Sequence, residues 1–301
     1  MNQTKFLYQI PGLLKLAFLE LRKNDPLRMA GATAFFTTFA LPAILIIIIQ
    51  LFGLFINPKV LSSQLINRLT SLLGPESGNQ LRVTLMNFRK LAENWYITIA
   101  GFVFLIFVAT TLFNVIKNAF DQIWSIKIKS HPGLLFTLKI RTKSFVAILL
   151  AGILFLAGLL TDGLEVFLGK KINVFPDDIK AIFQGAVTQI ITAVIFTCWF
   201  IMLFRYLADG KPSWFGAIAG GIVTGVLFSA GKLLIKWALV HSNVGTVYGA
   251  SGSIVLLLLF VFYSSFVLYY GASFIRVFAE ATDQKIEPIR KAYVYEMEEQ
   301  K

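Results

Sequence analysis

Six long apolar runs, separated by shorter polar segments, dominate this 301-residue chain. Each run exceeds the ~20 residues that an α-helix needs to cross the hydrocarbon core of a bilayer, whereas helices of soluble proteins average ~11–12 residues. The pattern therefore predicts an all-α polytopic membrane protein with six transmembrane helices. The predicted spans are residues 29–56, 95–120, 144–168, 179–203, 214–240 and 253–277.

Two segments outside these spans have the spacing of amphipathic helices. The external loop at 57–94 begins with Asn57 and Pro58, a pair typical of an N-cap and a first helical residue, and its leucines then recur on one face. The segment after Pro11 is also apolar on one helical face, which predicts an interfacial helix leading into the first span. The apolar residues of that face are Leu13, Leu14, Ala17, Phe18 and Leu21.

The composition agrees with a membrane protein, because 15% of the residues are charged, against ~25% in a typical soluble domain. We expect one transmembrane domain over residues 1–282 and a charged cytoplasmic tail at 283–301. Lys and Arg near span ends are retained on the cytoplasmic side. Of the 28 such residues, 18 fall on the side that holds both termini and eight on the other. Both termini are therefore predicted to be cytoplasmic.

The formal net charge of +12 indicates an anionic partner. Cationic loops attract anionic lipid headgroups at about 1 kcal/mol per basic residue near the surface. Nucleic acid is the alternative, but the basic residues are scattered among loop ends and do not form a stripe or an aromatic-interleaved platform. We expect membrane lipids, preferably anionic, as partners and no nucleic acid. The sequence does not indicate whether the chain forms a homo-oligomer.

Ionisable residues inside a bilayer are costly, at ~2.5–3.5 kcal/mol each on insertion scales, so they usually face the protein interior or water. Asp162, Lys232 and Lys236 lie near the external ends of the third and fifth spans. The two lysines share one helical face by their i,i+4 spacing. They are candidates for a substrate pathway that takes an anionic headgroup or solute. The alternative is a pair of snorkelling lysines with Asp162 as a counter-ion.

A second polar cluster lies at the cytoplasmic ends of the second and fourth spans. Asn114, Lys117 and Asn118 recur at helical spacing, and Arg205 ends the fourth span. Lys117 and Asp121 are spaced for an i,i+4 ion pair. These residues are candidates for the inner opening of a substrate pathway, and the alternative is an ordinary polar patch at a helix end.

The fifth span is rich in glycine. Pairs four residues apart let a neighbouring backbone approach closely, which favours helix packing over a ligand groove. The paired glycines are Gly216 with Gly220 and Gly221 with Gly225.

The sequence lacks the residue sets that catalysis requires. His131 and His241 lie in predicted loops on opposite sides of the membrane, so they cannot share a metal ion or form one dyad. There is no spaced Cys/His set, Gly-rich phosphate loop or nucleophile elbow. We therefore expect no enzyme, no bound metal and no cofactor.

Three stretches of this chain resemble the YihY/BrkB membrane family, which also carries the old name ribonuclease BN. Residues 30–45, AGATAFFTTFALPAIL, resemble its opening span, and residues 118–124, NAFDQIW, the exit of its second span. Residues 248–274, which include YGASGSIVLLLLFVFYSS, resemble its final helix. The resemblance implies a six-helix protein of the bacterial inner membrane with both termini inside.

The chain departs from the family pattern at two positions. Family members often have an acidic residue where this chain has Ser273, and often Asn where it has Asp121. A carboxylate mechanism at the first position cannot be carried over. The ribonuclease name also fits poorly, since RNA cleavage usually needs clustered carboxylates with a metal ion or a His pair, and Asp121 and Asp209 lie far apart in sequence.

Two functions remain open. The first is a translocator of a lipid or an amphipathic anionic solute that serves envelope maintenance, with polar residues at both ends of a glycine-lined bundle. The second is a scaffold that transports nothing and organises envelope proteins or lipids through its external helices and basic tail.

Overall fold

The structure is a computed structural model, and it describes residues 3–55, 57–73, 75–91, 95–128, 177–241, 252–288 and 292–294, with a few helical residues between 146 and 153. Within this part of the chain five helices are long and apolar enough to cross a membrane. They are α2 (Pro26–Phe52), α5 (Trp95–Ile123), α7 (Asp177–Tyr206), α8 (Trp214–His241) and α10 (Gly252–Ala281).

Each of these helices begins and ends within four residues of a predicted span. The all-α polytopic class is therefore confirmed. The predicted third span, 144–168, lies almost entirely outside the described residues, as does most of what surrounds it. The number of six spans stays a prediction.

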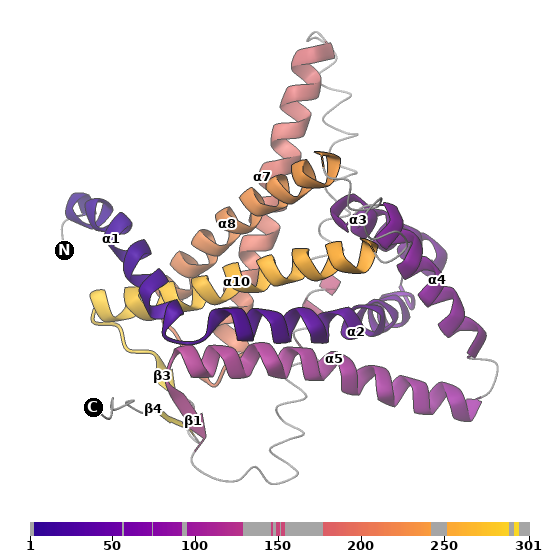
Figure 1. The fold of residues 1–301 in the computed structure, drawn as a ribbon, viewed down its shortest axis with the longest axis horizontal. Coiled ribbons are helices and arrows are strands. Elements are labelled where there is room, and N and C mark those ends of the chain that lie inside the picture. Colours follow the sequence, from indigo (N-terminus) through magenta and orange to yellow (C-terminus); the bar gives the residue numbers. More distant parts are fainter. Residues whose placement is uncertain are drawn as a thin grey trace.

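Helix α10 lies in the middle of the bundle, packed against α2 on one side and α8 on the other (Figure 1). Helix α2 packs in turn on α5, and α8 packs on α7. The described spans therefore form two sets, α2 with α5 and α7 with α8, that share α10. The main hydrophobic core draws residues from both sets and from α10. In it the fully buried rings of Phe120 on α5 and Tyr269 on α10 meet edge to face with centroids 6.2 Å apart.

The two ends of the bundle differ in structure. We call the end with the short strands the terminal face, and α3 and α4 lie at the opposite end (Figure 1). The antiparallel ladders of the terminal face pair β1 (Ile126–Ile128) with β4 (Ala292–Val294), and β2 (Gly210–Lys211) with β3 (Glu287–Pro288). Part of the expected tail after residue 282 is thus hydrogen-bonded to the segments that follow α5 and α7.

The two helices predicted in loop 57–94 are present as α3 (Pro58–Leu73) and α4 (Pro75–Leu91). The Asn57 side chain caps α3, because its Oδ1 accepts the amide of Lys59 at 3.0 Å. Each helix buries leucines of its apolar face. The buried leucines are Leu61, Leu65, Leu81 and Leu85.

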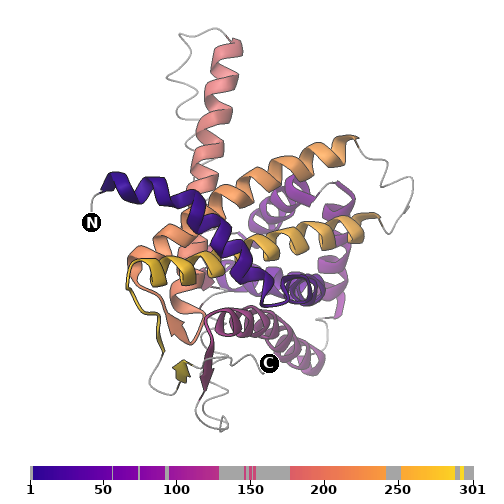
Figure 2. The ribbon, with the colours of Figure 1, turned by 60° about the vertical axis from the view of Figure 1, so that its left-hand side comes forward.

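Helix α1 (Gln3–Arg22) crosses α10 near the terminal face (Figure 2). Its apolar face, including Leu13 and Ala17, is buried against Phe274 and Phe278 of α10. The Tyr270 hydroxyl donates a hydrogen bond to the Leu14 carbonyl at 2.9 Å. The expected interfacial helix is therefore docked on the protein, and the part of it that stays exposed includes Phe18.

Candidate functional site: a buried ion cluster and an intramembrane lysine

The last turns of α5 and the turn after α7 bring three charged side chains together at the terminal face. Lys117 and Asp121 are one helical turn apart on α5, and Asp209 lies between α7 and β2. Lys117 Nζ lies 2.8 Å from Asp121 Oδ2 and 2.5 Å from Asp209 Oδ2. Asp121 Oδ1 accepts the backbone amide of Asp209 at 2.8 Å. We call Lys117, Asp121 and Asp209 the ion cluster.

The ion cluster is almost completely removed from solvent. The exposed fractions of its side chains are 4% for Lys117, 12% for Asp121 and 1% for Asp209. A buried charge loses the free energy of hydration, and it persists only when opposite charges and hydrogen bonds compensate that loss. The cluster provides such compensation across two segments 88 residues apart. It therefore joins the end of α5 to the turn between α7 and α8.

Aromatic side chains of the same two segments pack against one another. Phe120 lies between Phe204 of α7 and Trp124, at centroid distances of 5.3 Å and 5.6 Å. The Trp124 indole nitrogen donates a hydrogen bond to the Ala272 carbonyl of α10 at 2.9 Å. The motif NAFDQIW thus supplies a charge, an aromatic ring and a hydrogen-bond donor to one junction.

Arg276 of α10 forms a second polar junction beside the first. Its guanidinium donates to the Ile123 carbonyl at 2.5 Å and to the Ser125 hydroxyl at 3.0 Å. It also pairs with Glu20 of α1 at 3.0 Å and with Glu280 at 3.3 Å. Helices α1, α5 and α10 are therefore tied together at the terminal face. The sequence did not single out Arg276 as a site residue, because basic residues at the ends of spans are expected from their retention on the cytoplasmic side.

Lys232 lies between two spans, far along α8 from its start at the terminal face. It is half-buried, and its Nζ lies 3.4 Å from Gln189 Oε1 of α7. Both residues fall within candidate membrane spans. The cation thus contacts a polar side chain of the neighbouring helix, and polar contacts of this kind within membrane spans are typical of functional residues.

The other candidate pathway residues have different surroundings in the structure. Asn118 is exposed and Asn114 is half-buried on α5. The Arg205 guanidinium donates to the Pro212 carbonyl and stacks on the Trp214 ring at 5.2 Å. Asp162 and the side chain of Lys236 lie outside the described residues. Lys117 is buried and contacts the carboxylates of Asp121 and Asp209.

The glycines of α8 lie where neighbouring helices come closest. A Cβ atom at Gly220 would overlap Ile275 of α10, and one at Gly221 would overlap Ile201 of α7. A Cβ atom at Gly225 would overlap Thr197, also on α7. Gly216 is less crowded, since the nearest atom to its Cβ would be Ser213 Oγ at 3.2 Å.

Asp121 and Asp209 are far apart in sequence but adjacent in space, since both contact Lys117. The lysine ammonium lies between the two carboxylates, in the place that a bound cation would occupy. Within the described ranges, no three His, Cys, Asp or Glu side chains are grouped as metal ligands.

The fold and these junctions define a polytopic α-helical membrane protein. The family model described as "Virulence factor BrkB" matches residues 17–295, so the chain belongs to the BrkB family. This confirms the family that the three sequence stretches resemble.

Curated relatives are named as membrane proteins without a stated activity. A UPF0761 membrane protein of Saccharophagus degradans is 27% identical over 84% of this chain and 56% of its own length. One from Teredinibacter turnerae is 25% identical over 88% of this chain and 60% of its own length. The chain thus spans little more than half of these two relatives. A relative from Mannheimia succiniciproducens, 19% identical, is covered over 91% of its length. No solved structure matches the chain.

Proposed function

We propose that this chain is an inner-membrane translocator of a lipid or an amphipathic anionic solute, with its terminal face in the cytoplasm. The observation that carries the proposal is the position of Lys232, a half-buried cation between two spans. An ammonium group inside a span attracts an anionic headgroup, and the energetic cost of placing it there favours a functional role. The charge asymmetry between the two sides supports the proposed orientation.

The packing of the spans is compatible with a movement of one set of helices relative to the other. The α2–α5 set and the α7–α8 set each pack on α10. The ion cluster joins the two sets directly at the terminal face. We propose that the sets remain joined there while α7 and α8 shift relative to α2 and α5 further along the bundle, so that an anion passes Lys232.

The test is charge reversal at the intramembrane lysine in purified protein reconstituted into liposomes. Lys232→Glu should abolish translocation of a fluorescent anionic phospholipid, whereas membrane insertion and thermal stability stay close to wild type. Lys285→Glu is the matched control, because this lysine is exposed beyond the end of α10. Equal translocation by Lys232→Glu and wild type would remove the lysine from the mechanism.

Failure of the wild-type protein to move any lipid or amphipathic anion would favour the scaffold alternative. That alternative needs no polar path between the two faces. It would instead predict that a partner or a lipid domain is retained by the purified protein.

A further inference from the structure

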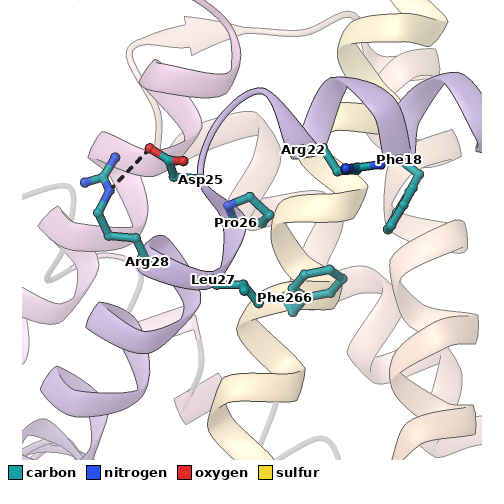
Figure 3. A pocket seen from close by; sticks show the side chains of 7 residues that line it. All are labelled: Phe18, Arg22, Asp25, Pro26, Leu27, Arg28 and Phe266. Carbon is teal, nitrogen blue, oxygen red and sulfur yellow. Dashed lines mark ion pairs between the residues drawn. The ribbon is translucent and has the colours of Figure 1, made fainter.

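An open depression of about 660 Å³ lies at the junction of α1 and α2, on the terminal face (Figure 3). Helix α1 ends at Arg22, a short turn follows, and α2 begins at Pro26. The volume lies within the range of ~300–1,000 Å³ that is typical of small-ligand sites. The residues that line the depression are Phe18, Arg22, Asp25, Pro26, Leu27, Arg28 and Phe266.

The charged part of the depression is basic. Arg22 and Arg28 both line it, and both are exposed. Asp25 lies 3.8 Å from Arg28, and the two side chains are 74% and 66% exposed. Solvent weakens an ion pair of this kind, so the guanidinium is available to an incoming anion. Arg22 has no ion pair with another described residue. A guanidinium binds phosphate through two parallel hydrogen bonds, which makes arginine well suited to a phosphate group.

The remaining wall of the depression is apolar and continues into a membrane span. Leu27 is 66% exposed and Phe18 is 45% exposed, and Figure 3 shows Leu27 and Phe266 next to each other below the turn. The long apolar run of α2 begins directly after Arg28. Charged and apolar walls therefore meet at the boundary where a lipid has its phosphate and the first part of its acyl chains.

We infer that the depression between α1 and α2 is a binding site for an anionic phospholipid of the leaflet that the terminal face meets. The phosphate binds Arg22 beside Phe18, and Arg28 turns from Asp25 on the other side of the turn to meet it, while an acyl chain runs along Phe18, Leu27 and Phe266. The bound lipid bridges the end of α1 and the start of α2 and stabilises the angle between them.

This site does not depend on the proposed translocation. It lies at the terminal face, whereas Lys232 lies 18 residues along α8 from Trp214, or roughly 27 Å at 1.5 Å per residue. Binding can therefore be measured without transport, and failure of one proposal leaves the other standing.

The experiment uses full-length protein in liposomes that contain a photoactivatable phosphatidylglycerol or phosphatidylcholine, with adducts mapped by peptide mass spectrometry. Phosphatidylglycerol should label the segment from Phe18 to Arg28 and Phe266 in preference to phosphatidylcholine. Loss of one charge-assisted hydrogen bond costs about tenfold in affinity, so Arg22→Gln/Arg28→Gln should reduce this labelling at least tenfold.

The control is Lys15→Gln/Lys23→Gln, which removes the same charge from exposed lysines outside the depression. It should leave the labelling of the depression within twofold of wild type. An equal loss in both double variants would show general surface attraction and overturn the site. Equal labelling by the two lipids, or full displacement by millimolar inorganic phosphate, would overturn the lipid as its occupant. Arg22→Lys/Arg28→Lys should give intermediate labelling, because the charge remains and the planar fork is lost.

Discussion

Replacement of Lys117 by methionine is the sharpest perturbation of the structure. Methionine fills a similar volume but leaves Asp121 and Asp209 buried without the ammonium that both contact. Removing one partner of a buried ion pair costs about 3–5 kcal/mol, because the other charge stays in a low-dielectric site. At about 2 °C per kcal/mol, typical of larger domains, the melting temperature should fall by roughly 6–10 °C.

The assay is thermal unfolding of the purified protein in detergent, followed by intrinsic tryptophan fluorescence, since Trp124 is buried and stacks on Phe120, the residue before Asp121. Lys23→Met is the matched control, because Lys23 pairs with Glu20 at 3.0 Å but is 70% exposed. Exposed pairs contribute about 0–1 kcal/mol, so this variant should melt within about 2 °C of wild type.

A double-mutant cycle tests whether the loss comes from the carboxylates. Asp121→Asn keeps an oxygen that can accept the Asp209 amide and removes one negative charge. The Lys117→Met/Asp121→Asn variant should therefore be more stable than the sum of the single losses predicts, by about 1–3 kcal/mol. A melting temperature for Lys117→Met equal to that of Lys23→Met would refute the reasoning, as would strict additivity in the cycle.

Three further predictions concern the junctions around the spans. Gly225→Val should destabilise the protein by about 1–3 kcal/mol through overlap with α7, whereas Gly31→Val should be near neutral because no atom lies within 4 Å of its Cβ position; melting curves of both variants check this. Trp124→Phe should cost about 0.5–1.5 kcal/mol, since it removes the hydrogen bond that the indole donates to the Ala272 carbonyl of α10; unchanged urea unfolding would contradict that bond. Arg276→Met should speed amide hydrogen exchange in α1, because the guanidinium pairs with that helix; exchange equal to wild type would remove this junction.

Most of the helical fold can be predicted from the sequence, because the length and period of apolar runs are local properties. Trp95 and Trp214 mark the starts of α5 and α8 in both the sequence and the structure. The docking of α1 was not predictable in the same way. An amphipathic face can be buried by lipid or by protein, and the hydrogen bond from Tyr270 to Leu14 depends on residues 256 positions apart.

The ion cluster was only half predictable for the same reason. The i,i+4 spacing of Lys117 and Asp121 indicates their pair, which the structure contains. Asp209 carries no comparable local signal, since it is a single acidic residue in a short turn. The one indication was that few acidic residues lie near the spans, so few residues could provide a second acceptor for a buried Lys117 ammonium.

The central claim, that this chain moves an amphipathic anion across a bilayer, is tested most directly with wild-type protein in sealed liposomes. A fluorescent phosphatidylglycerol would be distributed over both leaflets, and dithionite added outside would destroy the accessible fluorophores. The account predicts loss of nearly all fluorescence in liposomes that contain the protein, and retention of the inner-leaflet fluorescence in protein-free liposomes, because dithionite does not reach the lipids that face the interior. Equal retention in both preparations, with the protein folded and inserted, would contradict the claim.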